Sequence, residues 1–172
     1  KKRLGNIKTL KKFKKLFSYK VIITKPYKKK KLTISSSLIR KIIQKGQIQE
    51  ANKLLSRPWC IEGEVIKGEQ RGRRIGFPTC NIKLNSYTIP KIGVYSVLIQ
   101  STGLRKRGIA NIGYRPTFNG KSLLLEVNIF GIKKNLYNKI LKVSFIKFIR
   151  SEKKFKNIKD LKAQIKKDII SA

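Results

Sequence analysis

Histidine and methionine are absent from this chain of 172 residues, which also has only two cysteines and eight acidic residues. Because histidine is missing, no reaction step can use an imidazole as a base, a proton shuttle or a metal ligand. The two cysteines, Cys60 and Cys80, are too distant in the sequence for a zinc-binding cluster and too few for a dense disulfide framework. We therefore expect reduced thiols and a cytoplasmic protein.

The chain also lacks long apolar segments. No uninterrupted apolar run approaches the ~18 residues that cross a bilayer, and no hydrophobic signal segment opens the chain. We therefore expect no membrane partner. Without any methionine, Lys1 is not expected to be a natural translation start, so we expect a fragment or a processed product.

Lysine and arginine outnumber the acidic residues by 43 to 8, which gives a net charge of +35. Such a charge is compatible with nucleic-acid binding, because phosphate neutralisation drives non-specific association. A proteome-wide drift towards lysine, isoleucine and asparagine is the simpler explanation, since arginine is scarce and no nucleic-acid-binding motif is present. Non-specific binding to polyanions at low salt is expected in either case.

The first third of the chain predicts helices with little sheet. A short helical pattern lies within residues 1–31, a strand is expected over residues 20–24, and Pro26 with clustered lysines predicts a solvated loop over residues 25–31. Serine oxygens at residues 35–37 predict the start of a helix that ends at Gly46, and a second helix is expected over residues 47–55. These elements bury too little apolar surface alone, so we expect the end of a larger α/β domain.

After Pro58 the pattern changes to short segments rich in β-branched and aromatic residues, separated by turns. The strands predicted from them cover residues 59–67, 93–100, 105–112, 122–130 and 140–150. Their length and spacing favour an antiparallel barrel or sandwich. Asn157 predicts the N-cap of a final helix, whose apolar stripe is expected to pack on the barrel.

Glu126 differs from the other acidic residues because it lies in the most apolar of the expected strands, on the face opposite Leu125 and Val127. A desolvated carboxylate there would suit a general base. An exposed carboxylate paired with a neighbouring lysine is the alternative that the pattern leaves open. Glu152 and Asp168 are expected only to balance local charge or to cap a helix.

The glycine- and arginine-rich segment 67–81 is a second candidate site. Its glycines let backbone amides approach an anion, and its arginines suit phosphate, although no Gly-Lys-Ser or Gly-Lys-Thr of the common phosphate loop is present. Thr79 and Asn81 project to one side of an extended segment, and their neutral oxygens suit Mg²⁺. An ordinary polar turn before a strand is the alternative.

Several segments together resemble riboflavin kinases. Gly-Phe-Pro-Thr-Cys-Asn at residues 76–81 is similar to the Gly-Phe-Pro-Thr-Ala-Asn motif of that family. Further matches, in the family's order and spacing, are at residues 93–95, 110–118, 125–127, 136–137, 148–150 and 152–155. Upstream, Ile34-Ser-Ser-Ser-Leu-Ile-Arg40 is similar to the end of the nucleotidyltransferase half of bacterial bifunctional riboflavin kinase/FAD synthetases.

The resemblance implies a mainly β fold, with a six-stranded antiparallel Greek-key barrel and a C-terminal helix, preceded by a partial α/β nucleotidyltransferase fragment. It divides the chain into a remnant of the FMN adenylyltransferase domain (1–45), a connector helix (46–56) and a riboflavin kinase domain (57–172). The implied reaction moves the γ-phosphoryl group of ATP to the 5′-hydroxyl of riboflavin and gives FMN. Because the family's adenylyltransferase motif contains histidine, FAD synthesis is not expected from this chain alone.

The resemblance also implies roles for individual residues and partners. Glu126 would accept the proton of the attacking hydroxyl, and Thr79 and Asn81 would hold Mg²⁺. The residues implied to bind ATP are Gly68, Arg71, Gly72, Gly76, Thr79 and Asn81. Those implied to close over the flavin are Arg115, Pro116, Thr117, Tyr137 and Arg150. Riboflavin and ATP are the expected partners of a monomer; the alternative function is a non-catalytic flavin- or nucleic-acid-binding basic barrel.

The chain departs from the family pattern at a few positions. Cys80 replaces the usual alanine, and Asn128 stands where a histidine is often found. Residues 131–135 lack the acidic residues common in that loop, and Asn138 replaces a glycine after Tyr137. We expect these changes to affect the flavin loop and the rate rather than the fold.

Overall fold

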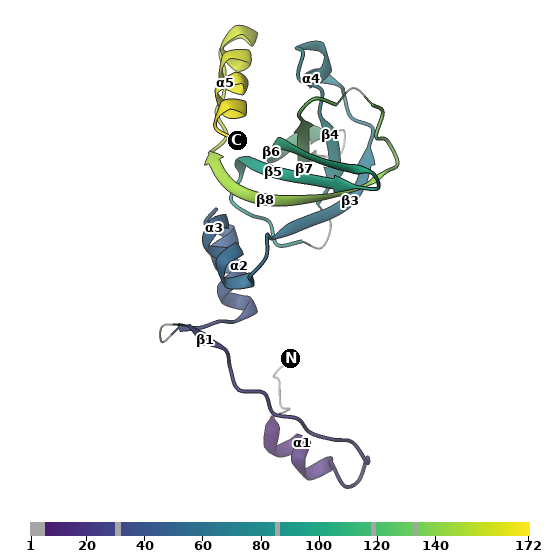
Figure 1. Cartoon of the computed structure of the whole chain (residues 1–172), viewed down its shortest axis with the longest axis vertical. Helices are drawn as coiled ribbons and strands as arrows, with labels where there is room; N and C mark the ends of the chain where they lie inside the picture. Colours follow the sequence, from purple (N-terminus) through teal and green to yellow (C-terminus); the bar gives the residue numbers. More distant parts are fainter. Residues whose placement is uncertain (1–5, 30–31, 85–86, 118–119, 133) are drawn as a thin grey trace. The chain divides into compact units, whose positions relative to one another are not determined.

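The computed structural model describes residues 6–29, 32–84, 87–117, 120–132 and 134–172 (Figure 1). It divides the chain into two compact units, Lys1–Ile34 and Ser35–Ala172, and each is described by itself. Expectations that fall on residues 1–5, residues 30–31, Phe118 and Lys133 lie outside the described residues.

The described part of the first unit holds a short helix, α1 (Ile7–Phe13), and a two-residue antiparallel pairing of β1 (Lys28–Lys29) with β2 (Leu32–Thr33). The strand expected over residues 20–24 is wrong, because these residues have no regular structure. Strand pairing occurs instead within and after the expected loop at residues 25–31. A strand needs a partner for its backbone groups and a surface for its apolar face, and residues 20–24 gain neither.

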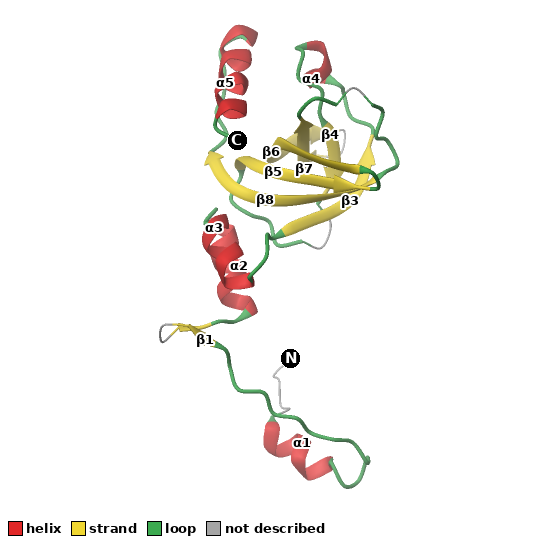
Figure 2. Cartoon of the chain, viewed as in Figure 1, coloured by secondary structure: helices red, strands yellow, loops and turns green. Residues whose placement is uncertain are grey.

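The second unit is built on a closed six-stranded antiparallel barrel in the order β3-β4-β7-β6-β5-β8 (Figure 2). The strands are β3 (Cys60–Ile66), β4 (Cys80–Lys83), β5 (Gly93–Ser101), β6 (Leu104–Thr117), β7 (Gly120–Ile129) and β8 (Ile140–Arg150). Because β4 pairs with β7 and not with β5, the chain crosses between them as a Greek key does. The expected six-stranded barrel with a C-terminal helix is confirmed.

Two helices, α2 (Ser36–Gln44) and α3 (Ile48–Leu55), precede the barrel in the same unit. Ser35 caps α2 by accepting a hydrogen bond from the Leu38 amide, as the serine-rich sequence predicts. Their buried residues belong to the same hydrophobic cluster as the barrel interior. Asn52 of α3 adds a polar link, since its Nδ2 donates to the carbonyl oxygen of Phe145 at 2.8 Å.

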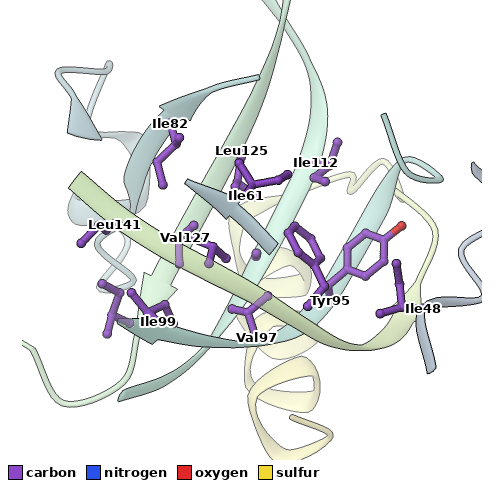
Figure 3. Packing of buried hydrophobic residues seen from close by; sticks show 14 of the residues in the cluster. Ile48, Ile61, Ile82, Tyr95, Val97, Ile99, Ile112, Leu125, Val127 and Leu141 are labelled. Atoms are coloured by element: carbon purple, nitrogen blue, oxygen red, sulfur yellow. The ribbon is translucent and has the colours of Figure 1, made fainter. Parts of the chain in front are cut away.

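Alternation along the strands separates the barrel interior from its outer face. On β7, Leu125 and Val127 are fully buried, and Glu126 between them projects to the opposite side. Figure 3 shows how the interior side chains pack, including Tyr95, whose ring meets that of Phe145 edge-on with centroids 5.2 Å apart. Burying a large apolar side chain contributes roughly 1.5–3 kcal/mol, so this interior fixes the strands that carry the outer-face residues.

The C-terminal helix α5 (Ile158–Ile170) begins where expected, because Asn157 accepts a hydrogen bond from the Asp160 amide at 2.9 Å. A buried ion pair joins α5 to the end of β8. Arg150 donates from Nε and Nη2 to the carboxylate of Asp168, at 2.8 Å and 2.7 Å, and Asp168 is only 2% exposed. Asp168 therefore anchors a helix, a larger role than the local charge balance expected from the sequence.

Candidate active site

A row of directly paired residues, four of them polar, crosses the outer face of the barrel. Glu126 on β7 lies opposite Asn81 on β4 and opposite Asn111 on β6. Val94 on β5 and Arg150 on β8 continue the row, since Val94 pairs with both Asn111 and Arg150. Directly paired residues of antiparallel strands project to the same side of the sheet, so distant parts of the sequence contribute to one surface.

A cavity of about 590 Å³ lies over this row, and we call it the Glu126 cavity. Its polar lining comes from the barrel strands, the segment before β4, the segment after β8 and α5, and includes Arg71, Thr79, Asn111, Arg115, Glu126, Asn128, Arg150, Glu152 and Asp168. Its apolar walls come from the end of the glycine-rich segment, from the segment before α5 and from α5, and include Ile75, Phe77, Phe155, Leu161 and Ile165. This combination suits a ligand with a broad apolar part and one reactive polar end.

Arg115 binds the carboxylate of Glu126. Its Nε donates to Glu126 Oε2 at 3.0 Å, its Nη2 donates to the same oxygen, and its Nη1 donates to Glu152 Oε1 at 3.3 Å. Burial lowers the pKa of the Arg115 guanidinium, but the hydrogen bond and charge of Glu126, followed by those of Glu152, outweigh burial and raise it. Glu126 is thus held by an arginine at 25% side-chain exposure, rather than isolated or paired with a lysine.

Glu152 is a site residue that the sequence alone did not single out. Its Oε1 accepts hydrogen bonds from Arg115 and, at 3.2 Å, from Asn111 Nδ2. Gly113 makes room for it, because a Cβ at that position would lie 2.0 Å from Glu152 Oε1. The matched segments contain both Gly113 and Glu152, but their contact depends on strands that are separated by β5 in the barrel.

Other expected flavin-binding residues occupy different positions. Arg150 lines the Glu126 cavity, with its guanidinium bound to Asp168. Pro116 and Thr117 lie in the last residues of β6, where the backbone pairs with the start of β7. The strand expected over residues 105–112 therefore extends to Thr117, since the β6–β7 ladder continues to the pair of Thr117 with Gly120.

Tyr137 lies in a second cavity of about 570 Å³, which we call the Tyr137 cavity. Its lining includes Val127 and Cys80, and burial raises the pKa of the Cys80 thiol. At the edge of this cavity, Gln70 Nε2 donates a hydrogen bond to the Tyr137 hydroxyl at 3.3 Å. Thr79 lines both cavities, so the segment before β4 forms the wall between them.

The glycine- and arginine-rich segment folds against that wall and contains a four-residue helix, α4 (Arg71–Arg74). Gly72 packs closely on the wall, because a Cβ there would lie 2.4 Å from the carbonyl oxygen of Phe77 and 3.3 Å from Thr79 Oγ1. The Phe77 amide also donates to the Gly72 carbonyl at 2.8 Å. Gly76 has a φ of +88°, which favours glycine, and nothing within 4 Å would meet a Cβ there.

Asn81 carries a buried oxygen suited to a cation. Among the described residues, its Oδ1 has no hydrogen-bond partner, although the side chain is only 8% exposed. A Cβ on Gly68 would lie 1.7 Å from Asn81 Nδ2, so only glycine at position 68 leaves room for the side-chain amide of Asn81. A neutral oxygen of this kind, with the hydroxyl of Thr79 two residues earlier, fits a divalent metal that takes its other ligands from phosphate and water.

The described residues contain no group of three or more acidic, cysteine or histidine side chains that could hold a metal ion by themselves. None of the helices described has the length and apolar character needed to cross a membrane.

Comparison with known proteins places these features in a family context. A family model described as Flavokinase: Riboflavin kinase matches residues 55–172. The bifunctional riboflavin kinase/FMN adenylyltransferase of Bacillus subtilis is 48% identical over 139 residues, which cover 78% of this chain and 44% of that protein. The protein of the same description from Haemophilus influenzae is 41% identical over 172 residues, covering 99% of this chain and 56% of that protein.

A solved structure has a similar fold. The crystal structure described as a macrolide-efflux protein from Streptococcus pneumoniae superposes with a TM-score of 0.80 and 36% identity. The match covers 95% of this chain and 53% of that chain. This chain spans about half the length of the curated relatives that it matches.

Proposed function

This chain belongs to the riboflavin kinase family, and we propose that it transfers the γ-phosphoryl group of ATP to the 5′-hydroxyl of riboflavin, giving FMN and ADP. The observation that carries the proposal is the position of Thr79 on a wall between two cavities, one of which contains Glu126. A two-substrate phosphoryl transfer needs such an arrangement, with acceptor and donor on opposite sides of the transferred group.

We assign riboflavin to the Glu126 cavity, because its apolar walls suit a flat ring system and its carboxylate can reach a hydroxyl at the polar end. We assign ATP to the Tyr137 cavity, from which the phosphates approach Thr79. In this arrangement Tyr137 contacts the nucleotide side, and its flavin contact, implied by the resemblance, stays a prediction.

In the proposed reaction, the riboflavin hydroxyl oxygen forms a bond to the γ-phosphorus, and the bond from that phosphorus to the β,γ-bridging oxygen breaks. The hydroxyl proton passes to Glu126. Arg115 and Asn111 both contact Oε2 of Glu126, so we assign Oε1 as the acceptor. Arg115 orients the carboxylate before the hydroxyl arrives.

The family uses ATP as co-substrate and a divalent metal, and we propose Mg²⁺ as that metal. Thr79 Oγ1 and Asn81 Oδ1 are the residues that would hold it, because Asn81 Oδ1 is buried and without a partner among the described residues. When bound, the metal would neutralise charge on the phosphates during transfer. The backbone around Gly68, Gly72 and Gly76 would lie next to the same phosphates.

The remaining assignments concern the whole protein. We propose that residues 1–45 are a remnant of an FMN adenylyltransferase domain, that residues 46–56 are a connector and that residues 57–172 are the kinase. FAD synthesis would then need an adenylyltransferase half that this chain does not supply. We further propose a cytoplasmic monomer, in line with its two free cysteines and the proposed use of ATP.

The test is FMN formation by the purified chain with riboflavin, ATP and Mg²⁺, measured by chromatography with fluorescence detection. Glu126→Gln should lower kcat by about 100-fold or more, since removing a general base costs about that much. Glu62→Gln is the matched control, because Glu62 is a strand carboxylate paired with Lys142 at the exposed surface. Wild-type turnover in Glu126→Gln would show that the base is assigned wrongly.

The same preparation tests the alternative functions. A non-catalytic flavin-binding barrel would give no FMN and would bind riboflavin equally with and without ATP and Mg²⁺. A nucleic-acid-binding barrel would keep its RNA affinity at ~0.3 M salt, where purely ionic binding should collapse. Either result without FMN formation would overturn the kinase proposal.

A further inference from the structure

Asn128 is a buried polar residue next to the proposed base. It follows Glu126 by two residues on β7, so both side chains project to the same face. Asn128 is 9% exposed and lines the Glu126 cavity. Its Nδ2 donates to the carbonyl oxygen of Pro78 at 2.7 Å, across 50 residues of sequence.

Pro78 and Thr79 form a short bridge between two anchored ends. On one side, the Phe77 amide is bound to the Gly72 carbonyl. On the other, the β4–β7 ladder begins at Cys80, which pairs with Val127. Proline has no amide hydrogen, so the carbonyl is the backbone group through which Pro78 itself can be held.

We infer that Asn128 is a positioning residue for phosphoryl transfer: its amide fixes the Pro78 carbonyl and thereby fixes Thr79 on the wall between the two cavities. The inference rests on the proposed kinase function. Asn128 acts through the backbone of the segment before β4 and needs no contact with either substrate. The hydrogen bond also links the strand of the base, β7, to the segment proposed to hold the nucleotide phosphates.

The physical requirement is an N–H donor of the right reach at position 128. Histidine also carries a ring N–H, so a histidine at position 128 can meet the same requirement. Leucine has the same number and branching of side-chain heavy atoms as asparagine but no donor, and serine is too short to reach the carbonyl. The kinetic effect should therefore follow the presence of the donor and not the size of the side chain.

Asn128→Leu should lower kcat/KM for ATP by about 10- to 100-fold, because a displacement of about 1 Å at a reacting group has effects of this size. The affinity for ATP with Mg²⁺, measured by calorimetry, should weaken as well. KM for riboflavin should change less than KM for ATP. Asn128→His should keep kcat/KM for ATP within about threefold of wild type. If Asn128→Leu fails to fold, Asn128→Ser takes its place in the test and should show the same kinetic losses.

Asn52→Leu is the matched control, because Asn52 also donates Nδ2 to a strand carbonyl, at 2.8 Å, but lies on α3. It should lower the melting temperature and leave kcat and both KM values near wild type. The inference is overturned if Asn128→Leu shows only the stability loss of Asn52→Leu, or if Asn128→His loses as much as Asn128→Leu.

Failure of the proposed function would look different. If the wild-type chain forms no FMN, the kinase proposal fails, whatever the variants do. Weaker binding of ATP with Mg²⁺ to Asn128→Leu than to Asn128→His would then still support the positioning role at the nucleotide site, and equal binding would overturn it.

Discussion

The Glu126 cavity and the Tyr137 cavity hold their polar groups in different ways. In the first, charged side chains bind one another, since Arg115 joins Glu126 to Glu152. In the second, the described edge contact is the hydrogen bond of Gln70 to Tyr137, between two exposed side chains. One cavity has its charges oriented before any ligand arrives, as chemistry requires, whereas the other is suited to a ligand that brings its own charge.

The largest effect is expected from breaking the ion pair of Arg150 with Asp168, which lines the Glu126 cavity. Asp168→Asn should lower the free energy of unfolding by about 3 kcal/mol, because it leaves the guanidinium of Arg150 without its buried partner. Urea unfolding measures this loss. Asp160→Asn, at an exposed position in the first turn of the same helix, should cost far less, and equal losses would contradict the proposed anchoring role.

A second substitution removes Glu152 from the ion pairs of Arg115 and leaves Glu126, the proposed base, in place. Glu152→Gln removes one of the two carboxylates that share Arg115, so the guanidinium is expected to bind Glu126 alone and to hold it too strongly. We expect the kcat of Glu152→Gln to be about tenfold lower than that of the wild type, with little change in KM for ATP. Steady-state kinetics with each substrate varied would test this, and an effect confined to KM for ATP would assign Glu152 to the other cavity.

Tyr137 tests the assignment of the ligands to the cavities. Tyr137→Ala should raise KM for ATP by a few-fold, on the order of one lost side-chain contact, and should leave KM for riboflavin nearly unchanged. Tyr137→Phe, which loses only the bond from Gln70, should have a smaller effect. A change in KM for riboflavin instead would favour the flavin contact that the resemblance implies.

Cys80 gives the smallest expected effect. Burial raises the pKa of its thiol, so less thiolate is present at pH 8 than in a free thiol, and alkylation should be slow and should accelerate as the pH rises. In a Cys60→Ser background, iodoacetamide labelling followed by mass spectrometry measures the rate. Bound ATP should slow it further, and a rate equal to that of a free thiol would contradict the burial of Cys80.

Prediction from sequence worked best where side-chain alternation and burial agree. The strand over residues 140–150 has the bounds that its pattern predicts, and the final helix begins directly after the capping residue Asn157, as expected. Residues 20–24 carry the same kind of apolar run, yet they form no strand. The pattern records a tendency to pair, whereas pairing itself depends on a partner elsewhere in the chain.

The candidate site shows the same difference between what a local pattern indicates and what depends on tertiary contacts. Local sequence singled out Glu126 and the Thr79–Asn81 pair as candidates, because an acid in an apolar strand and oxygen side chains two residues apart are visible without a fold. Glu152 and Asn128 were given no role of this kind, although Glu152 lies in a matched segment and Asn128 directly follows one. Each acts on a group more than 35 residues away: Glu152 on Arg115 and Asn128 on Pro78.

The amino-acid sequence by itself thus determined which segments alternate, where helices begin, and which residue types are available for chemistry in a chain without histidine. Only the tertiary structure decided which of those residues meet, namely that Arg115 lies between two acids and that Thr79 separates two cavities. The reason is that alternation and capping depend on neighbours within a few residues, whereas the closure of a barrel brings together strands whose pairing depends on the whole chain.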